Sequence, residues 1–197
     1  SMVMAIDEGI GRVIDTLEGA GIHANTMLVF VSDNGPALTT FKGMPEDWPR
    51  GEMLGSTEGL RGQKGTYWEG GIRVPFILSW PKLHDRGFVI DTPVTTLDLY
   101  PTFCALGGLA PSRDSELGGV NLLPFILGKS TRIAPRDMLW FSGSSGALRR
   151  GDWKLVFSPK DGEQLFDLSI DPYERQDQSL AQPQIKENLI SVIKQWR

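Results

Sequence analysis

Apolar and polar positions near the start of the chain follow first a helical and then a strand pattern. From Met4 to Leu17 the apolar residues recur at spacings of three and four, which predicts an amphipathic helix ended by Gly19 and Gly21. The continuous apolar run from Met27 to Val31 is typical of a strand buried on both faces. A helix followed by a buried strand indicates an α/β fold, in which helices flank part of a mostly parallel sheet.

The middle of the chain continues this alternation of strands and helices. Strand patterns are short apolar runs that end at polar residues or proline, and helix patterns begin at capping residues and end at glycine. We expect a strand at 76–80, a further short strand beginning at Val89 and Ile90, a helix capped by Thr95 or Thr96 and stopped by Gly107 and Gly108, and a short helix at 122–127.

The last third of the chain changes to a succession of short strands separated by Gly, Ser and Asp turns. Strands joined by tight turns imply an antiparallel sheet, here with strands at 138–141, 147–150, 153–157 and 164–168. After Pro183 the apolar residues recur at helical spacing, so a final helix should cover one face of that sheet. Arg150-Gly151-Asp152 could be an adhesion tripeptide, but a turn between two strands is the favoured interpretation. We therefore divide the chain into an α/β part at 1–135 and a small antiparallel β subdomain with a terminal helix at 136–197.

Composition excludes several classes of protein. The formal net charge is -4 and basic residues form no run, so neither nucleic acid nor an anionic membrane surface is an expected partner, and no apolar run is long enough to span a membrane. Cys104 is the single cysteine, and with His23 and His84 far apart a zinc site of Cys and His ligands is excluded. We expect no signal peptide, because no basic segment followed by an apolar core stands before the first helix, and the abrupt start of this helix suggests a chain cut from something longer.

Two segments between the first two strands carry candidate chemistry. Asp33 and Asn34 follow the first strand, where ligands gather in α/β sheets, and their oxygens suit a hard cation, although the same residues are also ordinary turn formers. Lys64 stands between Gly62 and Gly65, and such a lysine can approach an anion closely or can simply be a solvated surface residue. The long connection from 37 to 62 separates the two segments, and loops of this length are usually functional.

Several separate motifs in one order resemble the carboxyl-terminal half of type I sulfatases, which belong to the alkaline phosphatase superfamily. These motifs are Val29-Phe30-Val31-Ser32-Asp33-Asn34-Gly35, Gly62-Gln63-Lys64-Gly65-Thr66-Tyr67-Trp68-Glu69-Gly70-Gly71-Ile72-Arg73-Val74-Pro75, Leu97-Asp98-Leu99-Tyr100-Pro101-Thr102, Gly151-Asp152-Trp153-Lys154-Leu155 and Leu165-Phe166-Asp167-Leu168. The resemblance implies that residues 1–135 are the later part of a sulfatase catalytic domain.

The resemblance also implies roles for particular residues. Asp33 and Asn34 match the positions that bind calcium in the family, and Lys64 matches the lysine that contacts the sulfate. Such an arrangement suits sulfate ester cleavage, because a cation and an ammonium together offset the negative charge that gathers on the sulfate oxygens. Glu69, Gly70, Gly71 and Arg73 are expected to be scaffold residues that hold the lysine loop in place, with Glu69 paired to nearby backbone or to Arg73.

The chain departs from the family pattern in its nucleophile and in several other residues of the active site. The family uses a cysteine converted to formylglycine within a Cys-x-Pro/Ser-x-Arg motif, and Cys104, in Phe103-Cys104-Ala105-Leu106, does not match it. An apolar helical cysteine of this kind is typically core filler. Further acidic ligands, a second lysine and the catalytic histidines of the family also have no counterpart, and Asp33 with Asn34 supplies too few of the six to eight oxygens that calcium takes.

Three hypotheses follow from these observations. The chain is interpreted as a sulfatase fragment, inactive alone, that needs an amino-terminal half and acts on a sulfate ester, with sulfated carbohydrates as the class that family habit suggests. The alternatives are a phosphate mono- or diester hydrolase of the same superfamily and a noncatalytic binding module that retains the fold. The resemblance places the parent in the periplasm, the lysosome or outside the cell. Unpaired strand edges predict a homo-oligomer.

Overall fold

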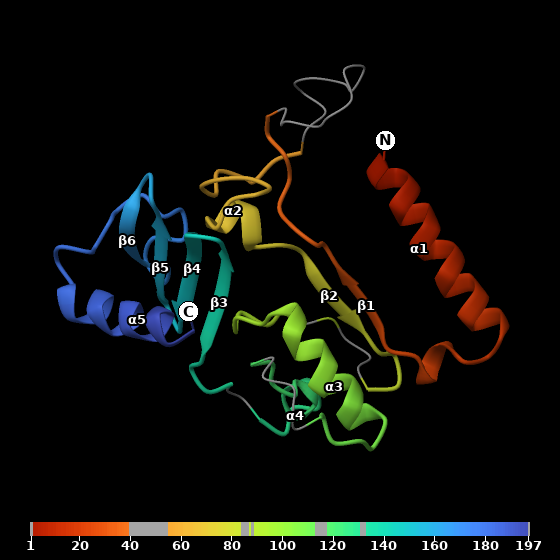
Figure 1. Ribbon diagram of the computed structural model, residues 1–197. Coiled ribbons are helices and arrows are strands. Elements are labelled where there is room, and N and C mark those ends of the chain that lie inside the picture. Colours follow the sequence, from red (N-terminus) through yellow and green to blue (C-terminus); the bar gives the residue numbers. More distant parts are fainter. Residues whose placement is uncertain are drawn as a thin grey trace. The chain divides into compact units, whose positions relative to one another are not determined.

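The computed structural model describes residues 2–39, 55–83, 87, 89–112, 118–130 and 133–196 (Figure 1). Most of the long connection predicted between 37 and 62, together with His84, lies outside these residues. The contacts divide the chain into two compact units: unit 1 is Ser1–Ser32 with Pro75–Asp91, and unit 2 is Asp33–Val74 with Thr92–Arg197. The predicted domain boundary between 135 and 136 stays a prediction. None of the described helices is both long and apolar enough to cross a membrane.

Unit 1 combines one long helix with a pair of strands. Its elements are the helix α1 (Met2–Gly19), the 3₁₀ turn η1 (His23–Asn25) and the strands β1 (Leu28–Val31) and β2 (Phe76–Ser79). Gly21, with a φ of 70°, ends α1 in a Schellman motif, because its N–H donates to the Glu18 carbonyl and the next N–H donates to the Leu17 carbonyl. The helix predicted from Met4 to Leu17 is therefore confirmed, with its stop after Gly19.

The strands of unit 1 correct the predicted direction of the sheet. β1 pairs with β2 in antiparallel register, with Leu28 opposite Ser79 and Val31 opposite Phe76, and no parallel pair occurs anywhere in the described residues. A continuous apolar run carries no information on the direction of the neighbouring strand. The predicted burial of this strand on both faces is also wrong, because no residue of β1 is buried in the described structure and Phe30 is 38% exposed. The further strand expected at Val89 and Ile90 is also wrong, because both residues are exposed and neither pairs with another strand.

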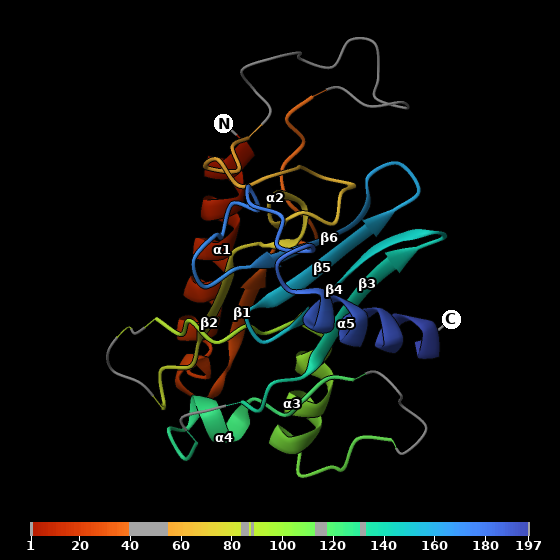
Figure 2. The ribbon, with the colours of Figure 1, turned by 90° about the vertical axis from the view of Figure 1, so that its left-hand side faces the viewer.

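Unit 2 contains the four-stranded sheet that the last third of the sequence predicts. Its elements are α2 (Glu69–Ile72), the 3₁₀ turn η2 (Thr96–Asp98), α3 (Leu99–Leu106), α4 (Leu123–Ile126), β3 (Asp137–Ser142), β4 (Ser145–Arg150), β5 (Trp153–Ser158), β6 (Gly162–Asp167) and α5 (Pro183–Trp196). The strands form an antiparallel meander in the order β3-β4-β5-β6, with the helix α5 packed on it (Figure 2). Arg150-Gly151-Asp152 contains the turn between β4 and β5, as predicted.

Both faces of this sheet are covered. On one face Leu189 and Ile193 of α5 pack against a buried cluster of strand residues that includes Leu148, Leu155 and Leu165. On the other face the packed residues are Ala147, Val156, Phe166 and Leu168, against which Tyr67, Trp68 and Trp140 lie. Tyr67 and Trp68 belong to the segment that follows Lys64, so the second face of the sheet supports the candidate anion-binding loop.

A buried ion pair anchors α3 in unit 2. The Asp98 carboxylate is fully buried, pairs with the Arg136 guanidinium and accepts hydrogen bonds from the N–H groups of Thr95 and Val120, each 2.9 Å long. The Thr95 side chain in turn accepts a hydrogen bond from the Leu97 N–H, which confirms Thr95 as the predicted cap. Cys104 lies half-buried on α3 and belongs to neither of the buried core clusters, so its expected role as core filler stays a prediction.

Candidate functional site

Backbone hydrogen bonds join the two segments in which the sequence predicts chemistry. The Gly35 N–H donates to the Gly71 carbonyl over 2.8 Å, and the Lys64 N–H donates to the Pro36 carbonyl over 2.9 Å. Asp33 and Lys64 are exposed, whereas Asn34 is half-buried. The structure therefore places Asp33, Asn34 and Lys64 on segments of unit 2 that are bonded to each other, although many residues separate them in the sequence.

Three glycines allow these segments to approach more closely than residues with side chains could. A Cβ at Gly35 would lie 1.9 Å from the Gly70 carbonyl oxygen, and a Cβ at Gly70 would lie 2.7 Å from the carbonyl oxygens of Arg61 and Gly62. A Cβ at Gly71 would lie 2.2 Å from the Thr66 carbonyl oxygen. All three glycines are thus required by backbone-to-backbone packing in three dimensions, which turn preferences along the sequence do not reveal.

The loop that carries Lys64 is closed by its own residues. Gly62 and Gly65 have φ values of 83° and 84°, in the left-handed region that glycine adopts without strain. The Thr66 hydroxyl donates to the Gln63 carbonyl over 2.8 Å and accepts a hydrogen bond from the Gln63 N–H over 3.1 Å. Lys64 therefore sits inside a closed turn with an exposed side chain, a suitable position for contacting an anion.

Gln63 is a structural residue of the site that the sequence did not single out. Its Oε1 accepts hydrogen bonds from the N–H groups of Leu38 at 2.7 Å and Thr39 at 3.0 Å, and its Nε2 donates to the Thr39 hydroxyl at 2.9 Å. Gln63 thereby bonds the segment after the Asp33-Asn34 turn to the Lys64 loop. The position of Gln63 directly before Lys64 could have marked it as part of the site, but nothing in the sequence indicated which residues it would bond.

The prediction that the Glu69 side chain pairs with nearby backbone or with Arg73 is wrong: in the described contacts it pairs with a distant lysine. The Glu69 side chain is buried, and its Oε1 accepts a hydrogen bond from Lys154 Nζ on β5 over 2.8 Å. Arg73 contacts Glu69 only through the backbone, where its N–H donates to the Glu69 carbonyl over 2.8 Å. A carboxylate that is removed from water requires a cation beside it, and Arg73 is exposed, so the buried Lys154 meets this need.

Glu174 completes this buried cluster. Its Oε1 lies 2.7 Å from Lys154 Nζ, and its Oε2 accepts a hydrogen bond from the Glu69 N–H over 2.7 Å. Burial raises the pKa of Glu174, and the adjacent Lys154 ammonium offsets part of this shift. Burial also lowers the pKa of Arg149, whose Nη1 lies 4.0 Å from Glu69 Oε2, and Glu69 opposes that shift. Two carboxylates and two cations thus balance one another beneath the Lys64 loop.

The residues of the candidate metal site fit calcium in kind but not in number. Carboxylate and amide oxygens, such as those of Asp33 and Asn34, are ligands that calcium prefers, but calcium takes about six to eight oxygens. Within the described ranges, no group of three or more His, Cys, Asp or Glu residues is arranged to hold a metal ion. His23 pairs instead with Glu18 in unit 1, at 3.2 Å. The described part of the chain therefore lacks a complete calcium shell.

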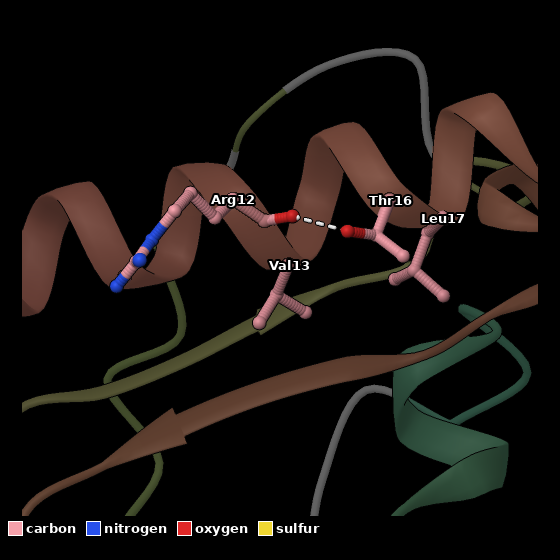
Figure 3. Close-up of a pocket in the computed structure, with 5 residues that line it drawn as sticks. Arg12, Val13, Thr16 and Leu17 are labelled. Atoms are coloured by element: carbon pink, nitrogen blue, oxygen red, sulfur yellow. Dashed lines mark hydrogen bonds between the residues drawn. The ribbon is translucent and has the colours of Figure 1, made fainter.

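The surface of α1 in unit 1 has a hollow, and none of the predicted site residues lines it. It is lined by Gly9, Arg12, Val13, Thr16 and Leu17, and the Thr16 hydroxyl donates to the Arg12 carbonyl over 2.7 Å (Figure 3). Arg12 is the single ionisable residue in its lining. The hollow has no group of polar side chains that could perform chemistry.

Comparison with known proteins gives a consistent result. The family model named Sulfatase matches residues 1–109. The steryl-sulfatase of Mus musculus is 36% identical over 131 residues, which cover 66% of this chain and 20% of the relative. The arylsulfatase H of Homo sapiens is 36% identical over 141 residues, which cover 72% of this chain and 24% of the relative. The chain thus spans about a fifth to a quarter of these relatives.

Solved structures resemble almost the entire chain. The crystal structure of Ps i-CgsB in complex with k-i-k-neocarrahexaose superposes with a TM-score of 0.80 at 29% identity and covers 99% of this chain and 41% of that protein. The PsFucS1 sulfatase from Pseudoalteromonas sp. superposes with a TM-score of 0.71 at 27% identity and covers 96% of this chain and 40% of that protein.

Proposed function

We propose that this chain, which belongs to the sulfatase family, supplies Asp33, Asn34 and Lys64 to the active site of a sulfuric ester hydrolase. The observation that carries the proposal is the bonding of the Lys64 loop to the turn after Asp33 and Asn34, through the Lys64 N–H and the Gly35 N–H. These bonds keep an ammonium and two oxygen ligands on adjoining segments. An active site for a sulfate ester needs both kinds of group near one another.

Lys64 is the residue that binds the sulfate group in this proposal. Hydrolysis of a sulfate ester gathers negative charge on the sulfate and leaving oxygens, and a fixed ammonium stabilises that charge without reorganising water. The closed turn between Gly62 and Gly65 orients the lysine, and its exposed side chain can reach a substrate from solvent.

Asp33 and Asn34 would hold part of a calcium shell that residues outside this chain complete. Calcium, when bound, supplies a Lewis acid that polarises the sulfate. The formylglycine nucleophile must also come from outside, since Cys104 lies in the wrong sequence context and is half-buried on α3. We therefore propose that the chain is inactive alone and requires an amino-terminal half, with a sulfate ester, in particular a sulfated carbohydrate, as substrate.

An aryl sulfate assay tests this proposal. The chain alone should release no sulfate, and adding an amino-terminal sulfatase half that carries the nucleophile should produce activity. Lys64→Ala should lower that activity about 100-fold or more, the usual effect of removing one charge-stabilising group. Lys160→Ala, which alters an exposed lysine in the turn between β5 and β6, is the matched control and should have no effect.

Two outcomes contradict the proposal. Turnover by the chain alone that survives Lys64→Ala would show that other residues perform the chemistry. A reconstituted enzyme that cleaves an aryl phosphate in preference to the aryl sulfate would instead favour a phosphate ester hydrolase of the same superfamily.

A further inference from the structure

We propose that Glu174 and Lys154 are positioning residues, which hold Lys64 in place by fixing Glu69 and Arg61 on either side of it. This inference rests on the proposed function only in giving the Lys64 loop a role in sulfate binding. None of the three charged residues Glu69, Lys154 and Glu174 reaches the exposed Lys64 side chain in the described contacts, so their effect would pass through the backbone.

Glu174 contacts the Lys64 loop on both sides. Its backbone carbonyl accepts a hydrogen bond from Arg61 Nη1 over 3.0 Å, and its Oε2 accepts one from the Glu69 N–H over 2.7 Å. Lys64 lies between Arg61 and Glu69 in the sequence. Glu174 also has a φ of 54°, a conformation disfavoured for any residue with a Cβ, so surrounding contacts must hold it there.

Lys154 joins the two carboxylates of this cluster. Its Nζ lies 2.8 Å from Glu69 Oε1 and 2.7 Å from Glu174 Oε1, and the side chain is fully buried on β5. Without this ammonium the two carboxylates would face each other with only Arg149, at 4.0 Å from Glu69, to balance them. Breaking a buried ion pair by removing one partner leaves an uncompensated charge and is strongly destabilising.

Aromatic packing adds a second connection between the loop and the sheet. The Arg61 guanidinium lies 3.5 Å from the centre of the Trp68 ring, which is a cation–π contact. Trp68 in turn meets Phe166 of β6 edge to face, with ring centroids 5.7 Å apart. The β-sheet of the last third of the chain therefore supports the Lys64 loop by both charge and packing.

The supported loop then fixes the candidate site through its backbone. The Gly70 N–H donates to the Arg61 carbonyl over 2.7 Å, which closes the loop directly after Glu69. The Lys64 and Gly35 N–H groups bond the loop to the Asp33-Asn34 turn. If Glu69 moved, the bonds that hold Lys64 beside this turn would loosen, and the sulfate affinity would fall without any change in Lys64 itself.

Amide hydrogen exchange in the 197-residue chain tests this proposal directly. The probes are the N–H groups of Gly35, Lys64 and Gly70, each normalised to the core amides of Leu148 and Leu155 to remove the effect of global stability. Lys154→Met should accelerate the normalised exchange of the three probes about 100-fold, as expected for loss of a buried ion pair that acts locally. Titration with inorganic sulfate should show an affinity lowered about tenfold or more, because the lysine is no longer held in place.

Two further comparisons separate positioning from general destabilisation. Arg136→Met is the matched control, because it also removes a cation from a buried carboxylate, that of Asp98, which has no described contact with the loop. It should leave the normalised exchange of the probes unchanged. Glu174→Gly keeps the left-handed backbone and removes the carboxylate, so it should accelerate exchange of the three probes as Lys154→Met does. Glu174→Gln retains an oxygen acceptor for the Glu69 N–H, so the probes should keep most of their protection from exchange.

Each contrary result has a distinct meaning. Equal effects of Lys154→Met and Arg136→Met on normalised exchange, or equal effects of Glu174→Gly and Glu174→Gln, would overturn the positioning role. A wild-type chain that fails to bind sulfate while its loop amides remain protected would contradict the proposed role of Lys64 in sulfate binding. In that case the exchange comparison would still decide whether Glu174 and Lys154 hold the loop.

Discussion

Replacing Gly35 by alanine should disrupt the junction between the Asp33-Asn34 turn and the Lys64 loop. The new Cβ would lie 1.9 Å from the Gly70 carbonyl oxygen and 3.1 Å from the Gly71 Cα. Ordinary contacts between such atoms exceed 3 Å, so the two backbones must separate by roughly an ångström. That separation would break the bond from the Gly35 N–H to the Gly71 carbonyl, which is 2.8 Å long.

The cost of this substitution follows from two contributions. Overpacking costs about 1–3 kcal/mol and loss of a buried backbone hydrogen bond costs about 1 kcal/mol, so Gly35→Ala should destabilise unit 2 by about 2–4 kcal/mol. Urea unfolding followed by Trp fluorescence measures this free energy. The sulfate affinity of the chain should fall in parallel, since Lys64 loses its fixed position beside the turn.

Gly9→Ala provides a control with the opposite sign. Gly9 lies in the interior of α1, and a Cβ there would meet nothing within 4 Å. Alanine is favoured over glycine in a helix by about 0.5–1 kcal/mol, so this variant should stabilise unit 1 slightly. A Gly35→Ala chain with unchanged urea midpoint and unchanged sulfate affinity would refute the close packing on which the site geometry rests.

Two further predictions concern the second unit. Leu189→Ala on α5 removes a side chain that is 2% exposed and packed on the sheet, so it should lower the free energy of unfolding by about 2–5 kcal/mol. Leu180→Ala, at a side chain that is 95% exposed, is the control and should change this free energy very little. Equal urea midpoints for the two variants would contradict this packing. Burial tends to raise the pKa of Asp177, but hydrogen bonds donated by the Leu165 and Ser179 N–H groups outweigh it and hold the pKa below its usual value. Asp177 therefore contributes stability above its unfolded pKa of about 4, and this is lost as the pH falls through the lower folded value. In urea midpoints measured against pH, Asp177→Asn should remove the loss of stability that protonation of Asp177 causes in acid. If the variant and the wild-type chain lose stability equally in acid, Asp177 is not the source of this loss.

Local patterns in the sequence predicted most of the secondary structure correctly. Apolar spacing predicted α1 and α5, and short alternating segments bounded by turns predicted the four strands of the unit 2 sheet. These predictions succeed because helix and strand periodicity depend on neighbouring residues. The short helix α2, which begins at Glu69, went unnoticed because its four residues include Gly70 and Gly71, which have low helix propensity.

Family resemblance, rather than spacing, indicated which residues to examine for chemistry. Asp33, Asn34 and Lys64 were each compatible with ordinary surface roles when considered alone. The order of several motifs in the sequence implied that they serve one site, and the sulfatase family model matches residues 1–109, the range that contains all three residues. Their roles in binding calcium and sulfate stay predictions.

Contacts between distant residues were beyond the reach of sequence patterns. Whether β1 runs parallel or antiparallel to its neighbour depends on the path of a long connection, and the apolar run of β1 is the same in both cases. Glu69 was expected to pair nearby, but its partner Lys154 follows 85 residues later, because a buried carboxylate takes whichever cation the fold buries beside it. Periodicity and motif order thus establish the elements and the candidate residues, whereas strand direction, glycine close packing and buried charge pairing arise only when the chain folds.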